Sequence, residues 1–254
     1  MSNINYGDTI AVWFSCGAAS AVAAKKTVEK YKDIATIRIL NNPIKEEDED
    51  NRRFLLDIQE WIGLPIESVL SRHYPSQSCV DIWAKRKYMS GPTGAPCTMI
   101  LKREARQDWE SQNAHNHIVM GFTYDEIKRH QRFILTERSN VLPVLIDLKI
   151  TKDDCYKIIE KSGIKLPRMY YQGYPNANCI GCVKATSATY WNHVRVQHPE
   201  VFKERSQQSR ELGVKLTYLK GERIFLDDLD PKAKGRSMKS MDIECSIFCE
   251  EYQK

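Results

Sequence analysis

The chain has 254 residues, of which 28% are charged and 42% are hydrophobic, and its formal net charge is +5. This balance is typical of an ordinary globular protein. No apolar run approaches the about 18 residues of a membrane-spanning helix, and Met1–Asp8 lacks the features of a signal peptide. We therefore expect a cytoplasmic protein, whose eight cysteines would not form a disulfide framework. The charge permits nucleic-acid binding, but no dense Lys/Arg run argues for it.

Strand-like and helix-like segments alternate through the first 150 residues. Apolar, β-branched runs predict strands at Ile10–Phe14, Ile34–Leu40, Ile66–Leu70, Ile118–Phe122 and Val141–Leu148. Helical periodicity predicts helices at Ala19–Lys30, Asn51–Gly63, Asp81–Met89, Met99–Glu110 and Asp125–Thr136. This alternation favours a doubly wound α/β fold of Rossmann-like type with a mostly parallel sheet.

The pattern changes after Thr151. Helices are predicted at Lys152–Ser162, Ala185–Gln197 and Pro199–Leu212, and one short strand within Gly221–Leu229. We therefore expect an α/β domain that binds an adenine nucleotide over residues 1–150. Residues 151–254 would form a helical, cysteine-rich appendage packed on it.

The loop after the first strand has the composition of a phosphate-binding turn. Small residues there allow close backbone approach, and the following helix offers its N-terminal N–H groups and dipole to an anion. The candidate contacts are Ser15, Cys16, Gly17, Ala18, Ala19 and Ser20. The loop is neither a Walker loop nor a GxGxxG fingerprint. The alternative is that these small residues serve only helix–sheet packing.

This loop resembles a variant of the PP-loop, SGGxDS, of the adenine nucleotide alpha hydrolase-like superfamily, with Ala19 in place of the Asp. The 3′-phosphoadenylylsulfate (PAPS) reductase branch often departs in the same way. Asn51–Gly63, Gly94–Arg103 and Gly121–Arg129 are also similar to segments of that branch. The resemblance implies a PP-loop-type fold that binds ATP, PAPS or adenylylsulfate, with Mg as an optional metal. Asn41, Gly121 and Arg129 would be further nucleotide contacts.

Five cysteines are candidates for metal binding. Cys179-Ile-Gly-Cys182 is a CxxC turn that can chelate one metal or cluster. With the upstream Cys97, this layout resembles that of iron-sulfur adenylylsulfate reductases, which carry a Cys-Cys pair there. We predict a [4Fe-4S] cluster on Cys97, Cys179, Cys182 and Cys249, with Cys245 as the alternative fourth ligand.

If neither tail cysteine is a ligand, one iron would stay open. Zinc is the alternative metal, and unligated thiols are the third interpretation. We interpret the other three cysteines as bystanders: Cys16, Cys79 and Cys155.

Two residues are predicted to be catalytic. Glu244-Cys245 resembles the Glu-Cys-Gly-(Leu/Ile)-His ending of sulfonucleotide reductases, in which the cysteine is the nucleophile. Lys102 would hold a phosphate or sulfate or raise the potential of the cluster; alternatively it lies on a solvated helix face. Asp125 and Glu126 are expected to cap a helix rather than act as bases. The aromatic pair Tyr190-Trp191 would stack a base or, more commonly, fill a core.

Three functions fit these residues. The favoured one is ATP-dependent sulfur transfer (thiolation) to a nucleic acid or nucleobase, with sulfur delivered from the cluster or Cys245. The second is a sulfonucleotide reductase, an oxidoreductase that releases sulfite with a thioredoxin-like reductant. The third is a non-catalytic nucleotide sensor with a structural metal. The single Cys97 and the altered tail count against the reductase, and the missing PP-loop Asp counts against pyrophosphate chemistry.

Overall fold

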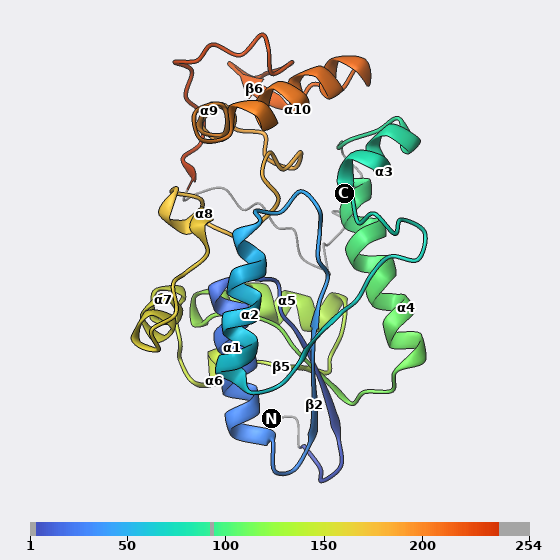
Figure 1. Ribbon diagram of the computed structural model, residues 1–254, viewed down its shortest axis with the longest axis vertical. Helices are drawn as coiled ribbons and strands as arrows, with labels where there is room; N and C mark the ends of the chain where they lie inside the picture. Colours follow the sequence, from blue (N-terminus) through green and yellow to red (C-terminus); the bar gives the residue numbers. More distant parts are fainter. Residues whose placement is uncertain (1–3, 92–93, 239–254) are drawn as a thin grey trace. The chain divides into compact units, whose positions relative to one another are not determined.

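Five short strands form a parallel sheet in the order β3-β2-β1-β4-β5 (Figure 1). The computed structural model describes residues 4–91 and 94–238. The strands are β1 (Thr9–Trp13), β2 (Thr36–Asn41), β3 (Ile66–Ser68), β4 (His117–Val119) and β5 (Val141–Leu142). The predicted α/β fold with a mostly parallel sheet is confirmed. The chain runs outward from β1 to β3 and then returns to β4 beside β1, so a topological switch point lies between β1 and β4.

Both faces of the central strand are covered by helices of the same unit. Ile10 and Val12 belong to a buried cluster with residues of α1 (Ala18–Tyr31) and α2 (Asp50–Ile62). Successive side chains of a strand point to opposite faces. Trp13 accordingly meets Trp109 of α4 (Ala105–Gln112), with ring centroids 5.9 Å apart.

Further helices of this half are the 3-10 turn η2 (Tyr124–Glu126), α5 (Ile127–Thr136), α6 (Val144–Asp147), α7 (Lys152–Lys161) and α8 (Arg168–Tyr171). The predicted strand Val141–Leu148 is wrong in its second half. It ends at Leu142 because Pro143 has no N–H for a ladder, and the Pro143 carbonyl instead accepts from Asp147 N at 2.8 Å and starts α6. Among the described residues, the helices are too short or too polar to span a lipid bilayer.

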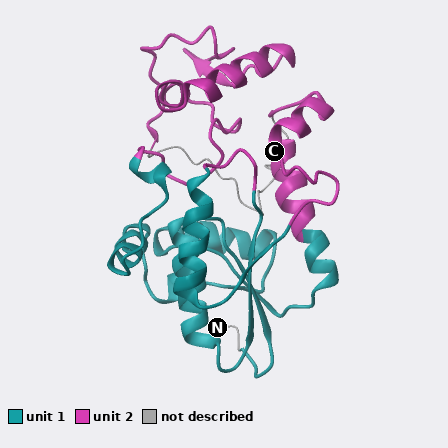
Figure 2. Ribbon diagram, in the orientation of Figure 1, with its two compact units in different colours: residues 1–43, 49–69, 107–171 teal, residues 44–48, 70–106, 172–254 magenta. Residues whose placement is uncertain are grey.

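The chain divides into two compact units, each built from separate stretches (Figure 2). Unit 1 holds residues 1–43, 49–69 and 107–171, and unit 2 holds residues 44–48, 70–106 and 172–254. This division differs from the predicted boundary at residue 150. Local composition cannot show that residues 70–106, which interrupt the α/β alternation, gather with residues beyond 171.

Helices are the main regular elements in the described part of unit 2. Its helices are α3 (Cys79–Arg86), the π-helix η1 (Thr98–Glu104), α9 (Ala188–Gln197) and α10 (Pro199–Glu211). An antiparallel hairpin follows, made of β6 (Thr217–Leu219) and β7 (Glu222–Ile224). The sequence predicted one strand there. The structure has two strands, which are joined by the turn Lys220-Gly221. Both turn residues have positive φ, as a two-residue hairpin turn requires.

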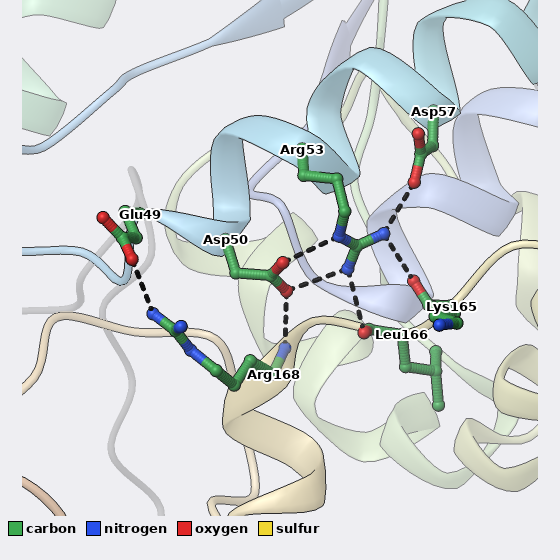
Figure 3. A network of polar contacts seen from close by, with 7 residues as sticks. All are labelled: Glu49, Asp50, Arg53, Asp57, Lys165, Leu166 and Arg168. Carbon is green, nitrogen blue, oxygen red and sulfur yellow. Dashed lines mark hydrogen bonds and ion pairs between the residues drawn. The ribbon is translucent and has the colours of Figure 1, made fainter.

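A polar network in unit 1 ties α2 to the residues that lead into α8 (Figure 3). Arg53 donates to both carboxylate oxygens of Asp50, at 2.7 and 2.8 Å, and to the carbonyl of Leu166 at 3.1 Å. The same Asp50 carboxylate accepts from the backbone N–H of Arg168 at 2.7 Å. The hydrogen bond from Arg53 holds the pKa of Asp50 below its usual value.

We expect Asp50→Asn to lower the free energy of unfolding by about 1–2 kcal/mol near neutral pH, because a bidentate, charge-assisted pair becomes a neutral contact. The folded-state pKa of Asp50 is lowered, so its contribution is present above the unfolded value of about 3.9 and is lost as pH falls through the folded value. Urea unfolding from about pH 6 to pH 3 should show the wild-type advantage shrinking with acidification. Asp57→Asn, the control, removes one contact of a 39%-exposed carboxylate and should cost less. A difference between Asp50→Asn and wild type that does not change with pH would contradict the prediction.

Candidate functional site

The loop after β1 is held in shape by its own side chains. Cys16 has a φ of 55°, a left-handed conformation that is uncommon for a residue with a side chain and is often found at functional sites. Ser20 Oγ accepts from Ser15 N at 3.1 Å and donates to the Gly17 carbonyl at 2.9 Å. The loop is therefore preformed, with Gly17 as the residue that precedes α1.

Two neighbours in unit 1 support this loop from outside. The buried Asn41, at the end of β2, donates its amide to the Phe14 carbonyl at 2.8 Å and toward Cys16 Sγ at 3.6 Å. Tyr170 Oη accepts from Ala18 N at 3.2 Å, and burial raises the pKa of Tyr170 to about 12. Asn41 thus has a positioning role in the loop. Its predicted contact with a nucleotide stays a prediction.

Gly121 brings the loop after β4 against the start of α1. A Cβ at this position would lie 2.7 Å from Ser20 N and 3.0 Å from the Ala19 carbonyl carbon. The two backbones therefore touch at the switch point between β1 and β4, where open α/β sheets bind their ligands. The predicted nucleotide residues Ser15 to Ser20 and Gly121 are brought together.

Arg129, the predicted anion contact, pairs with a carboxylate of its own helix turn. Its guanidinium lies 2.5 Å from Glu126 and over the ring of Phe122 at 5.2 Å. Glu126 forms a capping box with Thr123, which confirms its expected capping role. Asp125 also caps a helix, but a different one, because it accepts from Lys152 N at the start of α7 at 2.9 Å.

Four cysteines line one pocket in unit 2. Three of them are predicted ligands: Cys97, Cys179 and Cys182. The fourth is Cys79, so its interpretation as a bystander does not agree with its position. The remaining lining residues are Ile44, Glu46, Trp83, Thr98, Lys102, Ile180, Val183 and Lys184. Sequence spacing missed Cys79, since the thiol that starts α3 belongs to no CxxC motif.

The thiols in this pocket interact with one another and with a buried cation. Cys79 is hydrogen-bonded to Cys179 and Cys97, which raises the pKa of Cys79. The hydrogen bond between Cys79 and Cys97 lowers the pKa of Cys97 to about 7, and the hydrogen bond from Trp83 and the positive charge of Lys102 act in the same direction. Lys102 is 6% exposed and lies 3.6 Å from Glu47, so it does not lie on a solvated helix face.

The CxxC turn depends on Gly181. Its φ is +66°, and a Cβ there would lie 2.9 Å from Val201 Cγ1. Cys182 N donates to Tyr190 Oη at 2.8 Å. Tyr190 and Trp191 are 2% and 0% exposed, so they are core aromatics and do not present a face to a base.

The other cysteines divide into two groups. Cys16 lies in the loop after β1, and Cys155 is 0% exposed on α7, where burial raises its pKa to about 12. The described cysteines form no disulfide. The predicted nucleophile Cys245 and predicted ligand Cys249 lie outside the described residues. Within the described ranges, no group of three or more His, Cys, Asp or Glu side chains is arranged to hold a single metal ion.

Comparisons with known proteins find a likeness among solved structures. No family model matches the chain, and no curated protein matches it. The chain is similar in structure to the U34-tRNA thiolase NcsA from Methanococcus maripaludis, solved with its [4Fe-4S] cluster. The identity is 15% and the TM-score is 0.45, over 83% of this chain and 73% of that one. A likeness of this size assigns neither a function nor site residues, which depend on the residues themselves.

Proposed function

We propose that this protein is an adenine-nucleotide-dependent sulfur-transfer enzyme that thiolates a nucleic acid or nucleobase with an iron-sulfur cluster. The observation that carries the proposal is the thiol pocket, in which four cysteines from separate parts of the chain line one cavity of unit 2. A buried cysteine that only fills a core behaves as a small hydrophobe and has no need of other thiols. Thiols gathered around a cavity point to a thiophilic ligand. We place this chemistry in the cytoplasm, where thiols stay reduced.

The residues of the pocket fit an iron-sulfur cluster. Such clusters are held by cysteine thiolates and tuned by hydrogen bonds to sulfur. Trp83 Nε1 is buried, has no oxygen or nitrogen partner among the described residues and lies in the pocket wall, where its N–H can face sulfur. Lys102 places a buried positive charge beside Cys97, which offsets the negative charge of bound thiolates. When bound, the cluster would supply iron and inorganic sulfide to the pocket. Zinc, which also accepts thiolates, is the alternative.

The loop Ser15–Ser20 supports the nucleotide half of the proposal. It is preformed, precedes a helix N-terminus and meets Gly121 at the switch point of the sheet. ATP is the proposed nucleotide, with Mg as its metal. Asn41 and Arg129 are proposed to contact it, and membership of the PAPS reductase-like branch also stays a proposal.

The proposed reaction has two steps. In the first, a carbonyl oxygen of the acceptor base attacks the α-phosphorus of ATP; an O–P bond forms, pyrophosphate leaves and the ring nitrogen loses its proton. In the second, hydrosulfide from an inorganic sulfide donor attacks the ring carbon that carries the adenylated oxygen. The C–O bond breaks, AMP leaves and the proton on sulfur passes to the ring nitrogen. The loop Ser15–Ser20 would hold the phosphate groups of the nucleotide in place. Lys102, in the wall of the thiol pocket, would stabilise negative charge there.

The test uses the full chain, purified without oxygen and supplied with MgATP, sulfide and mixed RNA or DNA. We expect pyrophosphate and AMP to form only with nucleic acid, and radioactive sulfide to enter its nucleosides. Sulfite release from adenylylsulfate or PAPS on adding thioredoxin would instead identify a reductase. Nucleotide binding without turnover, by protein that contains zinc, would identify a sensor.

A further inference from the structure

We infer that Cys79, rather than a thiol near the C-terminus, completes the ligand set of the proposed cluster. The set then consists of four thiols of unit 2: Cys79, Cys97, Cys179 and Cys182. This inference deepens the proposed function and rests on it.

The position of Cys79 among the other thiols is the first argument. Its side chain is 4% exposed, lines the same pocket and makes hydrogen bonds with both Cys97 and Cys179. It therefore joins the upstream thiol to the CxxC turn. Cys155 shows the contrast, since its neighbours in the buried apolar cluster are residues such as Ile159 and Leu145.

The second argument is that one residue, Glu46, is hydrogen-bonded both to the backbone at Cys79 and to the CxxC turn, and so fixes their relative positions. The Glu46 carboxylate accepts from Ser78 Oγ at 2.6 Å and from Cys79 N at 2.8 Å. The Glu46 carbonyl accepts from Ile180 N, inside the CxxC turn, at 3.0 Å. A ligand set needs its side chains held by a rigid supporting shell. A thiol that only fills space would need no such support.

This ligand set has a consequence for the route of sulfur. Four cysteines saturate the irons of a [4Fe-4S] cluster, so no iron is left open for hydrosulfide. Hydrosulfide would then attack the nucleotide-activated acceptor without first binding an iron, and Cys249 would have no role as a ligand.

The experiment compares three serine variants of the full chain, each purified without oxygen and given ferrous iron and sulfide. Cys79→Ser tests the inference, Cys249→Ser tests the fourth ligand predicted from the sequence, and Cys155→Ser is the matched control for a buried thiol. Iron and acid-labile sulfide per chain and the electron paramagnetic resonance spectrum after reduction are measured. We expect at least a fivefold loss of iron, or a changed spectrum, for Cys79→Ser, and wild-type values for the other two.

A second measurement needs no variant and so does not depend on folding. Cyanide or excess sulfide is added to the reduced wild-type protein; a spectrum that stays unchanged supports an all-cysteine set, and a shift shows an open iron and overturns it. Loss of iron from Cys249→Ser with full retention by Cys79→Ser also overturns it. Wild-type protein that binds no iron defeats the proposed function. If the wild-type protein contains zinc instead of iron and only Cys79→Ser loses it, the cluster is ruled out but the four-cysteine ligand set is supported.

Discussion

Replacing Gly181 by alanine is expected to abolish metal binding in unit 2. The φ of +66° costs a residue with a side chain about 1–2 kcal/mol, and the added Cβ would lie 2.9 Å from Val201 Cγ1 and 3.2 Å from Arg205 Cγ. Val201 is β-branched and has a restricted side-chain conformation within α10, so the backbone of the CxxC turn has to move to remove the clash. We expect the free energy of unfolding to fall by about 2–4 kcal/mol in total. Bound iron should fall at least tenfold.

Gly213→Ala is the matched control for this change. Gly213 has a φ of +67°, and a Cβ there would meet no atom within 4 Å, so it shares the backbone strain without the close contact. It should lose about 1–2 kcal/mol and keep its iron. Urea unfolding and iron analysis of both variants provide the measurement. Equal iron content in the two would contradict the proposed role of the CxxC turn.

Replacing Gly121 by alanine should disrupt the nucleotide loop of unit 1. The new Cβ would lie 2.7 Å from Ser20 N and 3.0 Å from Ser20 Cα. These are backbone atoms at the start of α1, so neither can rotate away. We expect unfolding to become easier by about 1–3 kcal/mol and ATP to bind at least tenfold more weakly, as measured by calorimetry.

Gly163→Ala separates general destabilisation from damage to the loop. Gly163 follows α7 with a φ of +77°, and a Cβ added there would have no atom within 4 Å, so only backbone strain of about 1–2 kcal/mol is introduced. Its affinity for ATP should equal that of the wild type. If Gly121→Ala also kept full affinity, the nucleotide would not bind at the loop after β1.

Local patterns in the sequence predicted most elements of unit 1. Apolar runs identified all strands of the sheet in outline, because a buried parallel strand needs β-branched residues on both faces. Val141–Leu148 failed because its apolar composition suits a strand or a short buried helix, and Pro143 decided between them. Lys102 could not be placed on a buried or a solvated face, since its ion partner Glu47 lies far away in sequence.

The sequence by itself determined the α/β alternation, the small-residue loop at Ser15–Ser20 and the CxxC turn with its glycine. Each of these depends on neighbours within a few residues, so its physical signal is local. Only the tertiary structure decided that Cys79 lies with Cys97 and the CxxC thiols, and that residues 70–106 belong to unit 2. Contacts between residues so far apart in sequence follow from the path of the folded backbone, which no local spacing encodes.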